Sequence, residues 1–239
     1  KTVFNVAEAH ACYFEGGIDV YGSYGVPREK IHVVRNSPDT DKLFAARRQL
    51  EETERPQRDI YRLIHVGRLV EWKRVDLLLR AIAELRPRFP GINGVVVGTG
   101  PQEDRLKKLA AELGLTGIVR FTGGIYEPLD LGREMLGAGV YVLAGMGGLS
   151  INEAMCFGLP VVCSVCDGTE LFLVRDGKTG LRFSDGDLPD LCDKIADLLG
   201  DPNRAAEMGS QATELIRTEV NIHTVTQCYV GLLRGLVTS

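Results

Sequence analysis

The sequence lacks any apolar run long enough to span a lipid bilayer. It also lacks an excess of positive charge, since 28 Lys and Arg stand against 32 Asp and Glu, and the formal net charge of −4 over 239 residues argues against a surface that coats nucleic acid or membrane. Its four histidines are scattered, so they form neither a metal-binding pair nor the Ser–His–Asp order of a hydrolase. These absences leave an ordinary globular protein for which we expect no metal and no nucleic-acid partner.

The six cysteines do not indicate a disulfide or metal framework. Cys163 and Cys166 have the C-x-x-C spacing of redox or metal sites, but neither a second pair nor a nearby histidine accompanies them. Most of the others stand in apolar runs, where a free cysteine packs as a small apolar residue. We therefore favour core packing over a metal or redox role, and we expect a reducing, cytoplasmic location.

One stretch, residues 140–168, organises the rest of the chain. It begins with a short valine-containing run typical of a buried strand, and three glycines then let the backbone turn tightly and approach a ligand. Ser150 and Glu153 have the spacing of a capping box, which predicts a helix that begins near Ser150. Such a helix N-terminus offers free N–H groups and a positive dipole, so we expect phosphate here.

Apolar runs and amphipathic segments alternate regularly around this stretch. Buried strands are expected at residues 61–66, 94–97, 118–121, 140–144, 160–164 and 180–183. Helices are expected at residues 74–86, 102–113, 129–136, 188–199 and 204–218. This alternation predicts an α/β fold with a doubly wound parallel sheet.

The two ends of the chain are less regular. We expect strands at residues 2–6 and 31–35, and helices at residues 8–24, 41–54 and 224–237. Turn formers and a polar, proline-interrupted segment place a domain boundary between residues 36 and 59. The sequence begins with Lys1 in the middle of a pattern, so we expect a piece of a longer protein.

Ligands of doubly wound sheets bind outside the carboxyl ends of the strands. The candidates are therefore the residues that follow each predicted strand, namely 67–68, 98–100, 122–125, 145–150 and 165–170. Arg68 and Lys73 both follow the first of these strands. A guanidinium and an ammonium there fit either phosphate oxygens or a solvated loop, and the predicted helix N-terminus at the same edge favours phosphate.

Two other patterns each have two interpretations. Glu153 either closes a capping box with Ser150, which its spacing favours, or accepts hydrogen bonds from a ribose diol. Gly98 and Gly100 resemble part of a dinucleotide-binding fingerprint, but Glu103 stands where the third glycine belongs. A tight strand–helix turn is therefore favoured there, and a nicotinamide dehydrogenase is disfavoured.

The chain resembles the retaining GT-B glycosyltransferases of family four in the motifs VGRLVEWKRVDLLLRAIAEL, VVVGTGPQEDRLKKLAAELGL, IVRFTGGI and GGLSINEAMCFGLPVV. The segments VCDGTELFLVRDGKTGLRF and YGVPREKIHVVRNSPDTDKL extend the resemblance over nearly the whole chain. It implies two Rossmann-like domains separated by a cleft. Residues 1–45 would be the end of the acceptor-side domain and a linker, residues 46–220 the nucleotide-sugar domain, and residues 221–239 a helix that crosses back.

The resemblance also implies roles for individual residues. Arg68 and Lys73 would bind the diphosphate and stabilise charge on the leaving group, and Glu153 would hold the ribose. The remaining donor-binding positions would be Gly67, Arg120, Gly123, Ile125, Gly147, Gly148, Leu149 and Ser150. Neither a metal nor a cofactor is expected beside the nucleotide-diphosphate sugar, and the sequence does not choose between UDP and GDP.

One departure from the family matters, because Gly145 stands where the family has a glutamate that faces the donor sugar. We expect a hexosyltransferase that acts on a glycan or lipid-linked acceptor in polysaccharide synthesis. The alternative, favoured by Gly145, is a non-catalytic nucleotide-binding lobe. The missing domain would supply peripheral attachment to the inner face of the membrane. The piece alone would bind nucleotide, transfer no sugar, and pair with a second copy of itself.

Overall fold

The computed structural model describes residues 6–166 and 168–237, and six parallel strands form its main sheet. The strands are β3 (Arg62–Val66), β4 (Asn93–Val97), β5 (Val119–Gly123), β6 (Val140–Leu143), β7 (Val161–Ser164) and β8 (Gly180–Phe183). Their spatial order is β5-β4-β3-β6-β7-β8. The predicted doubly wound parallel sheet is therefore confirmed.

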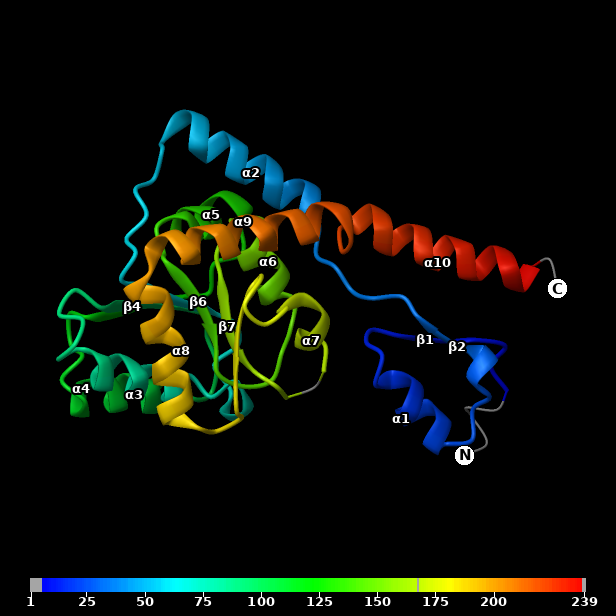
Figure 1. Ribbon diagram of the computed structural model, residues 1–239, viewed down its shortest axis with the longest axis horizontal. Coiled ribbons are helices and arrows are strands. Elements are labelled where there is room, and N and C mark those ends of the chain that lie inside the picture. Colours follow the sequence, from blue (N-terminus) through cyan, green and yellow to red (C-terminus); the bar gives the residue numbers. More distant parts are fainter. Residues whose placement is uncertain (1–5, 167, 238–239) are drawn as a thin grey trace.

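Helices cover both faces of this sheet (Figure 1). One face packs against α3 (Val75–Leu85), α4 (Glu103–Glu112) and α8 (Leu188–Gly200). The other packs against α2 (Thr40–Thr53), α5 (Pro128–Leu136), α6 (Ser150–Cys156) and α9 (Pro202–Thr218). Neighbouring residues of one strand serve opposite faces, as Leu63 and Ile64 do, so both must be apolar. This is why the strands read as continuous apolar runs in the sequence.

A smaller unit precedes the main sheet. It contains β1 (His10–Cys12), α1 (Gly17–Ser23), a 3₁₀ turn (Arg28–Lys30) and β2 (Ile31–Val33), and its two strands pair in parallel. The helix expected at residues 8–24 is therefore wrong over its first half. Residues 10–12 pair with β2 instead, and the helix begins at Gly17, where a Cβ would lie 2.7 Å from the Cβ of Cys12. The expected strand at residues 2–6 lies, except for Val6, outside the described residues.

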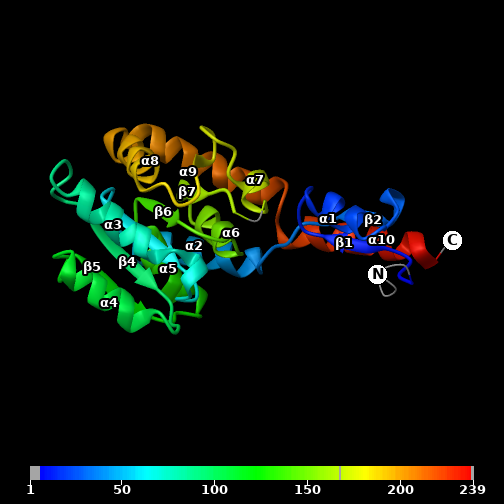
Figure 2. The ribbon, with the colours of Figure 1, turned by 90° about the horizontal axis from the view of Figure 1, so that it is seen from below.

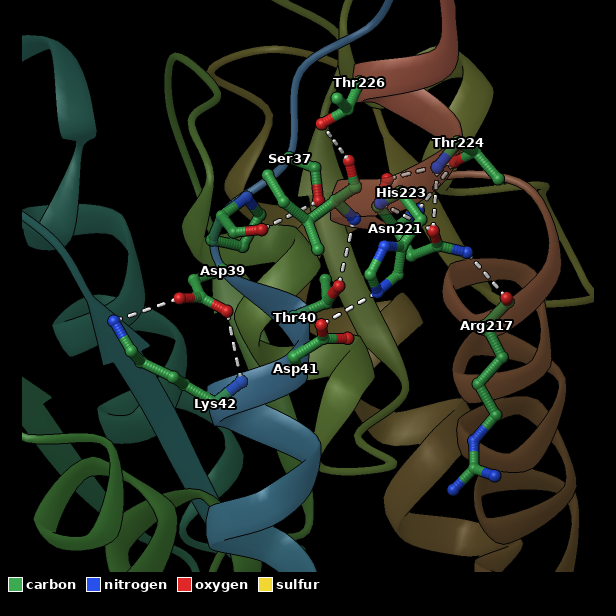
Figure 3. Close-up of polar contacts among 12 residues, drawn as sticks. Ser37, Asp39, Thr40, Asp41, Lys42, Arg217, Asn221, His223, Thr224 and Thr226 are labelled. Carbon is green, nitrogen blue, oxygen red and sulfur yellow. Dashed lines mark hydrogen bonds and ion pairs between the residues drawn. The ribbon is translucent and has the colours of Figure 1, made fainter.

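The two units are joined by the chain between β2 and α2 and by α10 (Ile222–Val237) (Figure 2). Figure 3 shows where these two connections meet. The hydroxyl of Thr40 accepts a hydrogen bond from the backbone N–H of Ile222 at 3.0 Å, and His223 Nε2 lies 2.8 Å from the Asp41 carboxylate. The expected boundary at residue 45 falls inside α2, whose apolar side packs on the main sheet.

The order of the strands fixes one special place in the main sheet. From β3 the chain moves outward through β4 to β5, and from β6 it moves outward in the opposite direction through β7 to β8. The neighbouring strands β3 and β6 therefore form the point at which the winding reverses, and a crevice opens there beyond their carboxyl ends. The loops that follow these two strands span residues 67–74 and 144–149.

Candidate functional site

A pocket of about 540 Å³ lies at this reversal point. Four of the donor-binding residues that the family resemblance implies line it, namely Gly67, Arg68, Ile125 and Glu153. They come from the loops after β3 and β5 and from α6, so the fold brings together segments that lie far apart in the sequence. The other lining residues are Val66, Val97, Gly98, Thr99, Gly100, Gly124, Tyr126 and Leu131.

The two glycines after β4 have a packing reason. A Cβ at Gly98 would lie 1.9 Å from the carbonyl oxygen of Gly67, and one at Gly100 would lie 2.4 Å from that of Leu69. Both distances are too short for any side chain. Positions 98 and 100 must therefore be glycine for the loop after β4 to lie against the loop after β3. The geometry matches the tight strand–helix turn that the sequence favoured.

The two predicted cations occupy one loop in different environments. Arg68 is exposed, and over the part of the chain that the structure describes its guanidinium makes no hydrogen bond or ion pair. Lys73 ends a 3₁₀ turn, η2 (Glu71–Lys73), and its ammonium donates hydrogen bonds to the carbonyl oxygens of Gly147 and, at 2.8 Å, Met146. Lys73 is thus held at the glycine loop, whereas Arg68 points into the pocket without a protein partner.

The predicted capping box is wrong. Helix α6 has Leu149 at its N-cap position and no side-chain cap, because it begins one position earlier than the capping box requires. The hydroxyl of Ser150 instead accepts a hydrogen bond from Tyr141 Oη at 2.7 Å. Glu153 is therefore released from a capping role.

The carboxylate of Glu153 is half-buried against the pocket. Among the described residues it has no hydrogen-bond or ion-pair partner, and burial raises its pKa. A carboxylate in such a position is an acceptor that awaits donors such as hydroxyl groups.

Some expected donor-binding residues lie elsewhere. Arg120 forms an ion pair with Glu134 of α5 at 2.6 Å, and its exposed side chain is not part of the pocket wall. Gly123 ends β5 with a positive φ of 76° and also does not line the pocket. Tyr126, which is 85% exposed, also lines the pocket, and the sequence analysis did not name it. Its position shortly after the end of β5 could have indicated this role.

Gly145 packs tightly against the turn that carries Lys73. A Cβ at position 145 would lie 2.1 Å from the carbonyl oxygen of Trp72, and that same oxygen accepts a hydrogen bond from Met146 N at 2.9 Å. This backbone therefore leaves no room for any side chain at position 145. Glycine in place of the expected glutamate therefore allows the close contact between this loop and the turn that carries Lys73.

Within residues 6–166 and 168–237, no cluster of three or more His, Cys, Asp and Glu side chains has a geometry that could hold a metal ion. No helix in these ranges combines the length and apolar character needed to cross a membrane.

Comparison with known proteins identifies relatives. A model of the family described as "Glycosyl transferases group 1" matches residues 46–215. The GDP-mannose-dependent alpha-(1-6)-phosphatidylinositol monomannoside mannosyltransferase of Mycolicibacterium smegmatis is 35% identical over 186 residues, which cover 73% of this chain and 47% of the relative. The lipopolysaccharide core biosynthesis glycosyltransferase LpsE of Rhizobium meliloti is 29% identical over 234 residues, which cover 96% of this chain and 65% of the relative.

Solved structures share the fold. Anabaena HepE in complex with UDP superposes with a TM-score of 0.81 at 21% identity, over 98% of this chain and 65% of that one. Sucrose-phosphate synthase from Thermosynechococcus elongatus gives a TM-score of 0.82 at 24% identity, over 99% of this chain and 60% of that one. The chain spans less than two thirds of the length of each of these proteins.

Proposed function

The chain belongs to the group 1 glycosyl transferases, and we propose that it is the donor-binding half of such an enzyme. Its pocket at the reversal point would hold a nucleoside diphosphate that carries the sugar to be transferred. HepE, which has the same fold, was solved with UDP, and the mycobacterial relative is described as GDP-mannose-dependent. Both nucleotides therefore stay candidates for this chain.

The observation that carries this proposal is the pairing pattern of Arg68 and Glu153. A guanidinium and a carboxylate line the same pocket, yet among the described residues neither is bonded to the other or to any other side chain. Opposite charges that are held apart suit a ligand with an anionic group at one end and hydroxyl donors at the other. A diphosphate and a ribose diol meet both requirements.

In the proposed reaction the bond between the sugar and the diphosphate breaks, and the anomeric carbon bonds to the oxygen of an acceptor hydroxyl. The hydroxyl proton passes to the leaving diphosphate or to solvent, and negative charge grows on the leaving group. Arg68 and Lys73 would stabilise that charge, together with the N-terminus of α6. Glu153 would orient the ribose by accepting its hydroxyl hydrogens. We further propose the retaining, family-four chemistry of a hexosyltransferase, with these cations taking the role that a metal has in other enzymes.

The rival proposal is a lobe that binds nucleotide without catalysis, and the fit of Gly145 against Trp72 is the observation that favours it. Measuring transfer by the full-length parent protein separates the two. Three further points stay proposals. The acceptor is a glycan or is lipid-linked, the protein attaches to the inner face of the membrane, and two copies of this piece pair with each other. We also propose that the protein has no nucleic-acid partner.

Substitution of the two cations tests the donor site. Arg68→Gln and Lys73→Gln should each weaken the binding of UDP or GDP by about tenfold or more, because a hydrogen bond to a charged group contributes about 1.5–3 kcal/mol. Isothermal titration calorimetry measures the effect. Arg80→Gln is the matched control, since Arg80 is exposed on α3 away from the pocket.

The three titrations have clear outcomes. Affinity that falls in both pocket variants and holds in the control supports the assignment. Affinity that is unchanged in both pocket variants would remove the basis for a diphosphate at this edge of the sheet.

A further inference from the structure

We propose that Tyr141 is a positioning residue for nucleotide binding, and that it acts through the hydroxyl of Ser150, which donates a hydrogen bond to the diphosphate. Tyr141 lies in β6 and Ser150 begins α6, so the glycine loop of residues 144–149 separates them in the chain. The inference rests on the proposed function, because it adds an uncharged donor to the proposed diphosphate site.

The phenol of Tyr141 is buried on the face of the sheet that α6 covers. Tyr141 pairs with Ile64 of β3 in the sheet register, and the residue is 0% exposed. Its Oη lies 3.2 Å from the carbonyl oxygen of Val66, at the end of β3, and 2.7 Å from Ser150 Oγ. One hydroxyl therefore joins the end of β3 to the start of α6. A phenylalanine would fill the same space, so only these two polar contacts need the hydroxyl.

The shorter of the two contacts makes Ser150 the acceptor of the phenol hydrogen. Burial raises the pKa of Tyr141, so the phenol keeps this hydrogen and stays a donor at neutral pH. A serine hydroxyl carries one hydrogen and can accept and donate at the same time. Among the residues that the structure describes, the Ser150 hydroxyl has no further hydrogen-bond partner. Its own hydrogen is thus left to donate to a ligand.

The same three oxygens allow a second arrangement before a ligand binds. Ser150 can donate to Tyr141 Oη while Tyr141 donates to the carbonyl of Val66, and both hydrogens are then used within the protein. A negatively charged oxygen beside Ser150 favours the first arrangement, because only that one presents a hydrogen to it, and hydrogen bonds to charged groups are the stronger ones. The phenol thus holds Ser150 Oγ in place in both arrangements.

Ser150 is placed between groups of the proposed nucleotide site. Val66, which shares the phenol with Ser150, lines the nucleotide pocket, as does Glu153 one turn further along α6. Two positions before Ser150, a Cβ at Gly148 would lie 3.2 Å from Lys73 Nζ. Ser150 is only half-buried, so a ligand can reach it. A diphosphate bound by the Lys73 ammonium would therefore lie next to the serine hydroxyl.

A double-mutant cycle on the whole chain, measured by calorimetry with UDP and GDP, tests both roles. Ser150→Ala removes the donor and should weaken nucleotide binding by about tenfold, whereas Ser150→Thr keeps a hydroxyl and should bind as the native chain does. Tyr141→Phe should weaken binding when Ser150 is present and should add no loss to Ser150→Ala, because the phenol acts through that hydroxyl. Tyr61→Phe is the matched control, since Tyr61 packs on Phe89 at the amino end of β3.

Each outcome decides one part of the inference. Native affinity in Ser150→Ala would overturn the donor role. An equal loss from Tyr141→Phe in both backgrounds, or a lower melting temperature with unchanged affinity, would show that the phenol is only structural.

Should Tyr141→Phe not fold, a crystal structure of the native chain with bound nucleotide decides instead. Ser150 Oγ is expected within hydrogen-bond distance of both Tyr141 Oη and a phosphate oxygen, and a Ser150 hydroxyl that contacts no phosphate oxygen would overturn the inference. Failure of the native chain to bind UDP and GDP would be a different result, because it would overturn the proposed function itself.

Discussion

At the scale of single residues, His65 is a buried titratable group beside the site. It lies in β3, is 1% exposed, and its Nδ1–H donates to the carbonyl oxygen of Val142 at 3.2 Å. Its Nε2 atom has no partner in the described ranges. Burial lowers the pKa of His65 from 6.5 to about 4, so the ring is neutral at pH 7.

This burial predicts a pH dependence of stability. Between pH 6.5 and pH 4 the unfolded chain binds a proton at His65 that the folded chain does not, so the free energy of unfolding falls as the pH is lowered. The expected loss is about 3 kcal/mol across that window. His65→Asn, whose amide can still donate to Val142, should be less stable at pH 7 but should lose less on acidification. Urea unfolding at several pH values measures both, and parallel pH profiles for the two proteins would contradict the account.

The residues of the site differ in how far the sequence reveals them. Arg68 could be predicted because a cation directly after a strand must lie at the ligand-binding edge of a parallel sheet. Glu153 was recognisable, but its pairing with Ser150 was wrong, because α6 begins at Ser150 itself and Tyr141 of the preceding strand bonds to that hydroxyl.

At the scale of elements, the site depends on the contact between the turn η2 and the glycine loop after β6. Trp72 and Met146 bond through their backbones, and Lys73 reaches the loop carbonyls from the same turn. Gly145 makes this contact possible because it has no Cβ. The contact therefore sets where the Lys73 ammonium lies.

Gly145→Ala should disturb both stability and binding. The added methyl group would be forced against the Trp72 carbonyl, and overpacking of this kind costs about 1–3 kcal/mol. Displacement of η2 should also weaken UDP or GDP binding, and Gly145→Glu should behave worse rather than regain a lost function. Gly200→Ala is the control, since a Cβ there meets no atom within 4 Å. Thermal melts and calorimetry are the measurements, and native values for Gly145→Ala would show that the two loops are not coupled.

The elements of the main sheet were predictable because each carries its own signal. Most of its strands contain a short apolar run, and the helices between them have one apolar side. The N-terminal unit gave the opposite result. Its strand β1 has three residues and pairs with β2 about twenty positions later, so its signal is weaker than the helical pattern around it. Gly16 and Gly17 indicated a break in the helical pattern. The sequence alone did not show that the helix follows these glycines, because that depends on the packing of Gly17 against Cys12.

At the scale of the whole molecule, the described chain contains the proposed nucleotide pocket and only a small unit besides the main sheet. The N-terminal unit and α10 form a small body beside the main sheet (Figures 1 and 2). Sugar transfer needs an acceptor held against the donor and water kept out. We therefore expect this chain to bind UDP or GDP and to transfer no sugar. A transfer assay with radiolabelled UDP-glucose and GDP-mannose, run on the calorimetry sample, checks this, and rapid turnover would mean that the active site lies elsewhere.

The central claim is that a nucleoside diphosphate binds beyond the carboxyl ends of the neighbouring strands β3 and β6. A crystal structure of the chain grown with UDP, and a second grown with GDP, tests it most directly. The account predicts, for at least one nucleotide, the diphosphate against Arg68 and Lys73, the ribose hydroxyls within hydrogen-bond distance of Glu153, and the base beside Ile125 and Tyr126. A nucleotide bound at any other edge of the sheet, with this pocket left unchanged, would contradict it.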